Sequence, residues 1–209
     1  MDKQLNVTKG NLRDCKFGVL KKYVVKKGDI LFRKVDVAKP ATGQIELKNK
    51  ISFEDFDFRV GEIKGVKDHP NADKLYLIKV DMGKNTADDL QIVSGLKDYY
   101  KKNELLNKKI IVLRNLRDAV IRGVASQGML LAAVHKKDLA LLTAKNTDNG
   151  SRIFIDLREK AKKEVTIDDF VKLKMVVKDK KIFYNNNALR TEVEDVKVDK
   201  KIKDGAKIE

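Results

Sequence analysis

The stretch Phe56-Asp57-Phe58-Arg59-Val60 alternates apolar with polar side chains, and a strand-like pattern continues through Gly61 to Lys67. A period of two residues predicts a β-strand with one buried face. Gly61 and Gly65 inside this run indicate a bulge or a coiled strand, which a small and tightly closed barrel needs. The stretch therefore predicts the first strand of a small β-barrel.

Four more strands are predicted after it. Their apolar runs are Leu75–Asp81, Leu90–Ser94, Lys109–Leu113 and Met129–Val134. A turn at His69–Asp73 separates the first two strands, because Pro70 lacks a backbone donor and Asn71 tolerates turn geometry. A lysine-rich stretch at 97–106, predicted as a helix or a loop, joins the third strand to the fourth. Five short strands with one such connection are typical of an OB-fold, a small Greek-key barrel.

Changes of composition divide the chain into three parts. Residues 1–50 carry 13 basic and 5 acidic side chains, and lysine pairs interrupt their short apolar runs, so we interpret them as a basic arm or linker. Residues 51–150 contain the predicted barrel, which begins with a helical turn capped by Ser52. Residues 151–209 are predicted as a small β-rich C-terminal domain. The predicted fold class is all-β, with short helices.

The pattern of the C-terminal domain predicts further elements. They are a strand at Arg152–Leu157, a capped turn at Thr166–Phe170, an alternating strand at Val171–Met175 and a strand at Ile182–Tyr184. The sequence contains no convincing internal repeat. We therefore expect this domain to pack on the barrel as a satellite.

The net charge indicates the class of partner. The 209 residues include 46 Lys and Arg against 31 Asp and Glu, a formal charge of +15. An excess of this size favours a polyanion, and nucleic acid comes before a membrane because no basic amphipathic helix stands out. No apolar run reaches the roughly 20 residues that span a bilayer, and the N-terminus lacks the apolar stretch of a secretory signal. A cytoplasmic location is expected.

Residues that could support catalysis are scarce. The single cysteine, Cys15, and the two histidines, His69 and His135, do not have the spacing of a zinc site. Neither histidine accompanies a nucleophile motif, and the sequence contains no Walker or dinucleotide-binding glycine pattern. We expect no enzymatic activity in this chain, no cofactor and no metal.

The stretch Leu113–Leu131 is the best candidate for contact with nucleic acid. Three of the nine arginines lie within it: Arg114, Arg117 and Arg122. The planar guanidinium group suits phosphate and stacks on bases. Ser126 and Gln127 add neutral groups that can bond to base edges or a 2′-hydroxyl. An exposed connection whose charges only keep it solvated explains the same residues equally well.

Four ordered segments of this sequence resemble the EMAP II-like tRNA-binding domain family. They are Phe56–Ile63, His69–Tyr76, Gln91–Leu96 and the signature that runs from Asn115-Leu116-Arg117 through Ile121-Arg122-Gly123-Val124 and Ser126-Gln127 to Gly128-Met129. The family includes free-standing tRNA-binding proteins, appendices of methionyl- and tyrosyl-tRNA synthetases, and cofactors of multisynthetase assemblies. The resemblance implies an OB-fold that binds tRNA without catalysis, next to a synthetase in cis or in trans.

A looser resemblance covers the C-terminal part. Residues 149–153 and the β-rich unit after them resemble the extra domain of the longer, eukaryotic-type members of the family. In that branch the extra domain occupies the surface through which the short bacterial forms dimerise. The resemblance therefore implies a monomer. It does not extend to the arm at 1–50.

Candidate tRNA contacts come from the signature and from charge and position around the presumed groove. The signature supplies Arg122, Ser126 and Met129. The remaining candidates are Lys64, Lys67, Lys74, Arg114, Asn115, Arg117 and Gln127. Met129 in an apolar strand fits a core position as well, since methionine fills gaps in cores.

The competing hypothesis is a secreted cytokine-like or protein-interaction module that binds RNA only through its charge. The resemblance implies it, because the opening strand of EMAP II is linked to cytokine activity. Glu62 stands where that cytokine segment has a basic residue, which argues against the activity. The preferred interpretation is a tRNA-binding module that serves a synthetase.

Overall fold

The computed structural model describes residues 51–84, 89–155, 161 and 164–209, and all of them belong to one compact unit, Lys48–Glu209. The predicted basic arm at 1–50 lies outside the described residues. No helix in the described part of the chain is long and apolar enough to cross a membrane.

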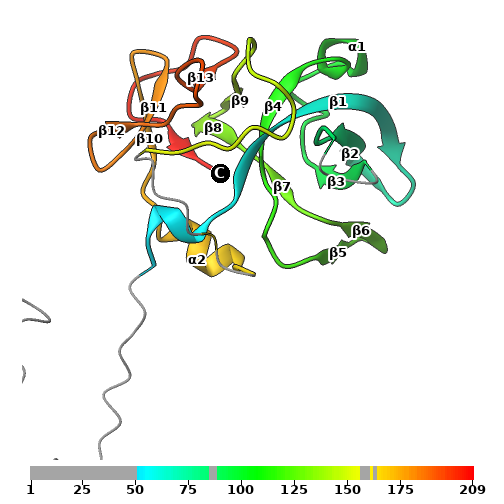
Figure 1. The fold of residues 1–209 in the computed structure, drawn as a ribbon. Coiled ribbons are helices and arrows are strands. Elements are labelled where there is room, and N and C mark those ends of the chain that lie inside the picture. Colours follow the sequence, from blue (N-terminus) through cyan, green and yellow to red (C-terminus); the bar gives the residue numbers. More distant parts are fainter. Residues whose placement is uncertain (1–50, 85–88, 156–160, 162–163) are drawn as a thin grey trace, which may run out of the picture. The chain divides into compact units, whose positions relative to one another are not determined.

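The first sheet contains the predicted barrel strands in the order β3-β2-β1-β4-β7, each antiparallel to its neighbour (Figure 1). These strands are β1 (Phe58–His69), β2 (Ala72–Asp81), β3 (Leu90–Ser94), β4 (Lys109–Leu113) and β7 (Met129–Leu130). The short helix α1 (Lys102–Leu105) joins β3 to β4. The prediction of a five-stranded OB-fold with one helical connection is confirmed.

The long strand β1 coils because its glycines allow close packing. Its register against β2 shifts between Ile63 and Gly65, where the sequence predicted a bulge. At Gly61 an added Cβ atom would lie 2.5 Å from Cγ1 of Val80. Only glycine therefore lets β1 approach β2 this closely.

A small hairpin leaves the first sheet between β4 and β7. It consists of β5 (Ala119–Ile121) and β6 (Val124–Ser126), which pair only with each other. The sequence analysis did not predict these strands. Arg122 (φ 50°) and Gly123 (φ 87°) form its two-residue turn, as is typical of hairpins whose twist matches the strands.

A second sheet closes on itself. It contains β8 (Ala132–His135), β9 (Asp138–Thr143), β10 (Val176–Lys178), β11 (Lys181–Tyr184), β12 (Asn187–Ala188), β13 (Lys197–Val198) and β14 (Lys207–Ile208). The order is β10-β14-β8-β9-β13-β11-β12, and an additional β10–β11 pairing closes six of the strands into a barrel. Strands that precede residue 150 thus share a barrel with strands that follow residue 175.

Three local predictions differ from the structure. The predicted strand at 129–134 is broken at Leu131 into β7 and β8. The predicted strand at Val171–Met175 is the end of helix α2 (Ile167–Val171) and the turn after it, because Thr166 caps this helix through reciprocal hydrogen bonds with Asp169. The predicted strand at Arg152–Leu157 makes only isolated bridges, at Arg152 and Phe154, in its described part.

Two apolar clusters fill the unit. One lies inside the first barrel and includes Ile63, Ile78 and Ile110. The other joins Phe56 and Phe58, whose rings stack 5.6 Å apart, to buried residues of the second barrel. The 3-10 helix η3 (Phe53–Asp55), with Ser52 as the predicted N-cap, leads into this cluster. The described residues between 51 and 209 are therefore held together by a shared core.

Candidate nucleic-acid interface

The β5–β6 hairpin carries an arginine at its exposed tip. Arg122 is exposed and lies in the turn itself, where its left-handed backbone precedes Gly123. A bulky residue with positive φ is uncommon and costs free energy. The surrounding contacts must therefore fix this turn.

A buried histidine holds the tip of the hairpin against the β1–β2 turn. The Nε2 atom of His69 lies 3.1 Å from the carbonyl oxygen of Ile121, and Nδ1 accepts a hydrogen bond of 3.0 Å from the backbone N–H of Asn71. Because Nδ1 accepts, the proton must sit on Nε2, which donates to Ile121. The side chain of Asn71 also donates to the carbonyl oxygen of Arg122, at 3.2 Å. These contacts orient the arginine-bearing turn.

The base of the hairpin is joined to β3 by side chains. The backbone N–H of Val93 donates to Oγ of Ser126 at 3.1 Å, and the N–H of Gln91 donates to Oε1 of Gln127 at 3.0 Å. In return, Nε2 of Gln91 donates to the carbonyl oxygen of Ala125 at 2.9 Å. These bonds accompany a backbone hydrogen bond of 2.8 Å from the N–H of Gln127 to the carbonyl oxygen of Gln91. The hairpin is therefore fixed at both ends.

Three of the predicted contact residues have positions inside the fold. Ser126 is buried, and its hydroxyl also donates to the carbonyl oxygen of Gly128. The half-buried Asn115 accepts from the N–H of Asp57 at 2.8 Å and donates to the carbonyl oxygen of Asp55 at 3.0 Å. Met129 is half-buried and packs against the second apolar cluster. These three side chains hold in place the backbone that carries the exposed candidate contact residues.

Four of the candidate cations are near the hairpin or the turn that supports it. Arg122 and Lys67 are exposed, and Lys74 is exposed beside Asp98, 3.5 Å away. Arg117, whose side chain is 66% exposed, lies just before the hairpin and contacts Glu164 at 2.9 Å. Exposed ion pairs of this kind contribute little and exchange readily for other partners.

The remaining two candidate cations lie outside this group. Nζ of Lys64 lies 2.8 Å from Oε1 of Glu62, and Lys64 is farther along β1 from the turn than Lys67. The hydrogen bond with Lys64 lowers the pKa of Glu62 and raises the pKa of the ammonium group, so both stay charged. Arg114 is half-buried just after β4, where its backbone N–H donates to the carbonyl oxygen of Asp57 at 3.0 Å.

Sequence reasoning missed the residues that fix the hairpin. His69 and Asn71 were interpreted as turn residues, and Gln91 as an ordinary strand position. Their partners are between 34 and 52 positions away in the sequence, and no local pattern connects them. No group of three potential metal ligands was found among the described residues.

The part of the chain that contains the first barrel is similar to known proteins. Residues 58–152 match the family described as putative tRNA binding domain. The chain is 57% identical to the methionine–tRNA ligase of Pyrococcus horikoshii over 95 residues, which cover 44% of this chain and 13% of that protein. It is 38% identical to the methionine–tRNA ligase of Caldanaerobacter subterraneus subsp. tengcongensis over 172 residues, 73% of this chain and 26% of that protein. The chain thus spans at most about a quarter of these two relatives.

A solved structure shows the same fold over a longer stretch. The C-terminal domain of Plasmodium vivax p43 superposes with a TM-score of 0.69 at 24% identity, covering 76% of this chain and 99% of that domain. The coverage is larger than that of the family match. The fold shared with this domain therefore extends beyond the first barrel.

Proposed function

We propose, since residues 58–152 belong to the putative tRNA binding domain family, that this chain is a non-catalytic module that binds tRNA for an aminoacyl-tRNA synthetase. The synthetase would be part of the same polypeptide or a separate protein. The relatives that are methionine–tRNA ligases support the first form. The place of action would be the cytoplasm, with the rest of the aminoacylation machinery.

The observation that carries the assignment of the site is the fixed, exposed arginine of the hairpin. We define the hairpin face as Lys67, Lys74, Arg117, Arg122 and Gln127. Because side chains of the β1–β2 turn and of β3 hold the hairpin in place, little conformational entropy is lost when a ligand binds. A guanidinium group on a fixed turn is suited to phosphate.

Shape rather than base sequence would be recognised. Tyr76, Tyr100 and the phenylalanines of the apolar clusters are buried, so few aromatic rings are left to stack on bases. Lysines and arginines that contact phosphates release counterions and give affinity without sequence choice. Both features favour a folded RNA over an extended single strand.

The C-terminal part supports the proposal of a monomer. Strand β14 pairs with β8, and Ala132 exchanges two backbone hydrogen bonds with Glu209. The edge of β8 is therefore occupied by this chain and is not free to pair with a second copy.

Fluorescence anisotropy of labelled total tRNA tests the proposal. We expect Arg122→Ala to weaken binding about tenfold at physiological salt. The matched control is Arg190→Ala, which removes the same charge from an exposed position of the second barrel and should change affinity about twofold at most. Equal losses in the two variants would contradict the assigned face. Equal affinity for tRNA, heparin and duplex DNA at matched salt would contradict recognition of tRNA.

A further inference from the structure

The outer edge of strand β5 is open. Strand β5 pairs with β6 and with no other strand in the described part of the chain (Figure 1). The opposite edge of the hairpin, formed by β6, is covered by β3, where Nε2 of Gln91 donates to the carbonyl oxygen of Ala125 at 2.9 Å. The hairpin therefore has one covered edge and one open edge, Ala119–Ile121.

The two-residue turn determines which backbone groups face the open edge. Ile121 and Val124 lie opposite each other on either side of the turn, so they form the hydrogen-bonded pair that closes it. Such pairs alternate along an antiparallel ladder, so the N–H and C=O of the next residue, Val120, point away from β6. Ala125, opposite Val120, follows the same rule at the covered edge, since its carbonyl oxygen accepts from Gln91. Val120 thus presents one donor and one acceptor outward.

The fold neither uses nor protects these groups. Among the described residues, the N–H and C=O of Val120 have no hydrogen-bond partner outside the hairpin. Its side chain is 74% exposed, more than any other large apolar side chain in the same part of the chain. Exposed strand edges usually carry a charge, a proline or a bulge that prevents pairing, whereas β5 reads Ala-Val-Ile. The open edge therefore has the properties of a surface that pairs with a ligand.

The charges beside the open edge favour an anionic ligand. Arg117 precedes β5 and Arg122 follows it, and both are exposed. Asp118 is the one carboxylate in the segment 117–127. Val120 is three residues from Arg117 and two from Arg122, which is at most about 10 Å and about 7 Å along the chain. Two guanidinium groups are thus within reach of phosphates on either side of a group bound at Val120.

The number of free backbone groups separates RNA from a peptide. A peptide that adds a strand to a sheet needs a row of outward donors and acceptors, and β5, with three residues, offers only those of Val120. A ribose 2′-hydroxyl needs one of each, because it is both a donor and an acceptor. The open edge fits a single nucleotide better than a peptide strand.

We propose that Val120 recognises ribose: its N–H and C=O bond to a 2′-hydroxyl of the bound RNA, and its side chain packs on the sugar. The proposal rests on the tRNA-binding function proposed above and adds the basis of its specificity. Lysine and arginine bind the phosphates of RNA and DNA alike. The 2′-hydroxyl distinguishes the two, so a contact at Val120 makes the hairpin selective for RNA.

Amide exchange at Val120, followed by NMR on the full chain, tests the contact directly. The probes are a methionine tRNA transcript and a DNA of the same sequence, each at saturating concentration. We expect the Val120 N–H to exchange about tenfold more slowly with tRNA than in the free protein, and at an unchanged rate with the DNA. An unchanged rate with bound tRNA, or equal protection by the DNA, would overturn the proposal.

A proline substitution tests the effect on specificity. Val120→Pro removes the outward N–H at an edge position, which proline tolerates, and should lower tRNA affinity about fivefold while changing DNA affinity about twofold at most. The matched control is Ala188→Pro. Ala188 lies on β12, the edge strand of the second sheet, beside another two-residue turn. It should leave both affinities within about twofold.

Two results with these variants would overturn the contact at Val120. One is an equal loss of tRNA affinity in Val120→Pro and Ala188→Pro. The other is a loss in Val120→Pro that is the same for tRNA and DNA. Arg122→Ala reports on phosphate binding and should weaken both ligands, so a failure of the proposed tRNA function is distinguishable from a failure of the ribose contact.

Discussion

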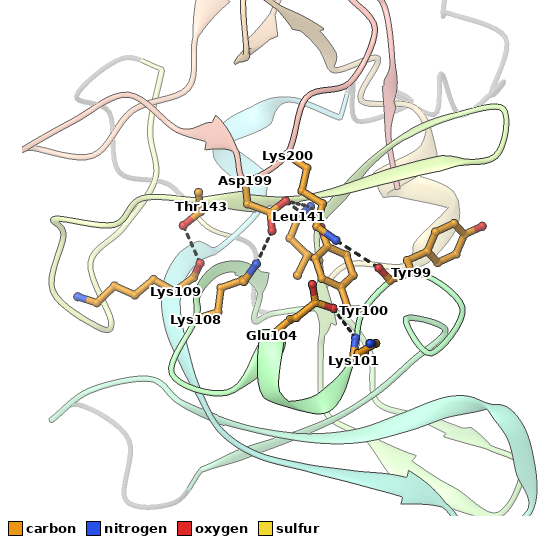
Figure 2. Close-up of polar contacts among 10 residues, drawn as sticks. All are labelled: Tyr99, Tyr100, Lys101, Glu104, Lys108, Lys109, Leu141, Thr143, Asp199 and Lys200. Carbon is orange, nitrogen blue, oxygen red and sulfur yellow. Dashed lines mark hydrogen bonds and ion pairs between the residues drawn. The ribbon is translucent and has the colours of Figure 1, made fainter.

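The hairpin contrasts with a second set of contacts, those of Asp199 with Tyr100, Lys108 and Leu141, which we call the joint (Figure 2). Each fixes a segment against residues far away in the sequence. The hairpin uses neutral groups, namely an imidazole, three amides and a hydroxyl, and leaves Arg122 exposed. The joint buries a carboxylate and pairs it with a phenol and an ammonium group. The first arrangement presents charge to a ligand, and the second uses charge to hold two barrels together.

The Tyr100 ring is a second difference between the joint and the hairpin. Nζ of Lys200 lies 3.5 Å and Nζ of Lys108 4.9 Å from the centroid of the Tyr100 ring. Burial, and then the hydrogen bond to Asp199, raise the pKa of the Tyr100 phenol. Buried charge of this kind stabilises only while every partner is present. The joint should consequently be more sensitive to single substitutions than the hairpin.

Asp199→Ala should have the largest effect. It leaves Tyr100, Lys108 and the N–H of Leu141 without their shared acceptor, and breaking a buried pair costs about 3–5 kcal/mol. Urea unfolding measures the loss of stability. The folded fraction should keep its tRNA affinity, because the hairpin is not touched. A variant as stable as the wild type would show that the joint does not hold the barrels together.

Ser126→Ala should lower the stability less than Asp199→Ala does, but it should lower the tRNA affinity more. It leaves the buried N–H of Val93 unpaired, at a cost of about 1–3 kcal/mol. Because the base of the hairpin is released, tRNA affinity should fall about fivefold. Urea unfolding and anisotropy on the same sample measure both quantities. Lost stability with unchanged tRNA affinity would separate the hairpin from the binding face.

Alkaline pH should weaken the joint. The raised pKa of Tyr100 means that the folded state keeps the phenol proton more tightly than the unfolded state does. The resulting stability is present below the ordinary tyrosine value of about 10 and is lost as pH rises above it. Urea unfolding between neutral and alkaline pH should show a smaller decline in Tyr100→Phe. Equal declines in both proteins would contradict the burial of this phenol.

His69→Gln should have the smallest effect. Glutamine can keep one of the two hydrogen bonds at the tip, so we expect a loss of about 1 kcal/mol in stability and about threefold in tRNA affinity. His135→Gln, at the end of β8, is the matched control. Identical tRNA affinities in the two variants would show that His69 does not orient the tip.

Regular alternation made the first barrel predictable. Of the second barrel, the sequence predicted the β-rich character and the strand at Ile182–Tyr184, which lies in β11, but not its closure. It did not predict the hairpin. Residues 56–67 and 75–81 are long enough for their period to identify strands. The hairpin strands have three residues each, and β13 and β14 have two, so they depend on pairing with distant segments. No local pattern carries that information.

The candidate site was predictable only in part, because the use of a polar side chain depends on its burial and its partners. The charge and position of Arg122 and Lys67 predict contact with nucleic acid, and the structure leaves both residues exposed. Ser126 and Asn115 have side chains that serve either a ligand or the backbone, and only burial and partners distinguish the two uses. In this structure their hydrogen bonds go to the backbone.

Hydrogen exchange of the full chain with and without total tRNA tests the central claim most directly. We expect slower exchange on binding in the hairpin at 117–127 and in the supporting turn at 67–74, with no change at the joint near Tyr100 and Asp199. Protection confined to the second barrel, with the hairpin unchanged, would contradict it.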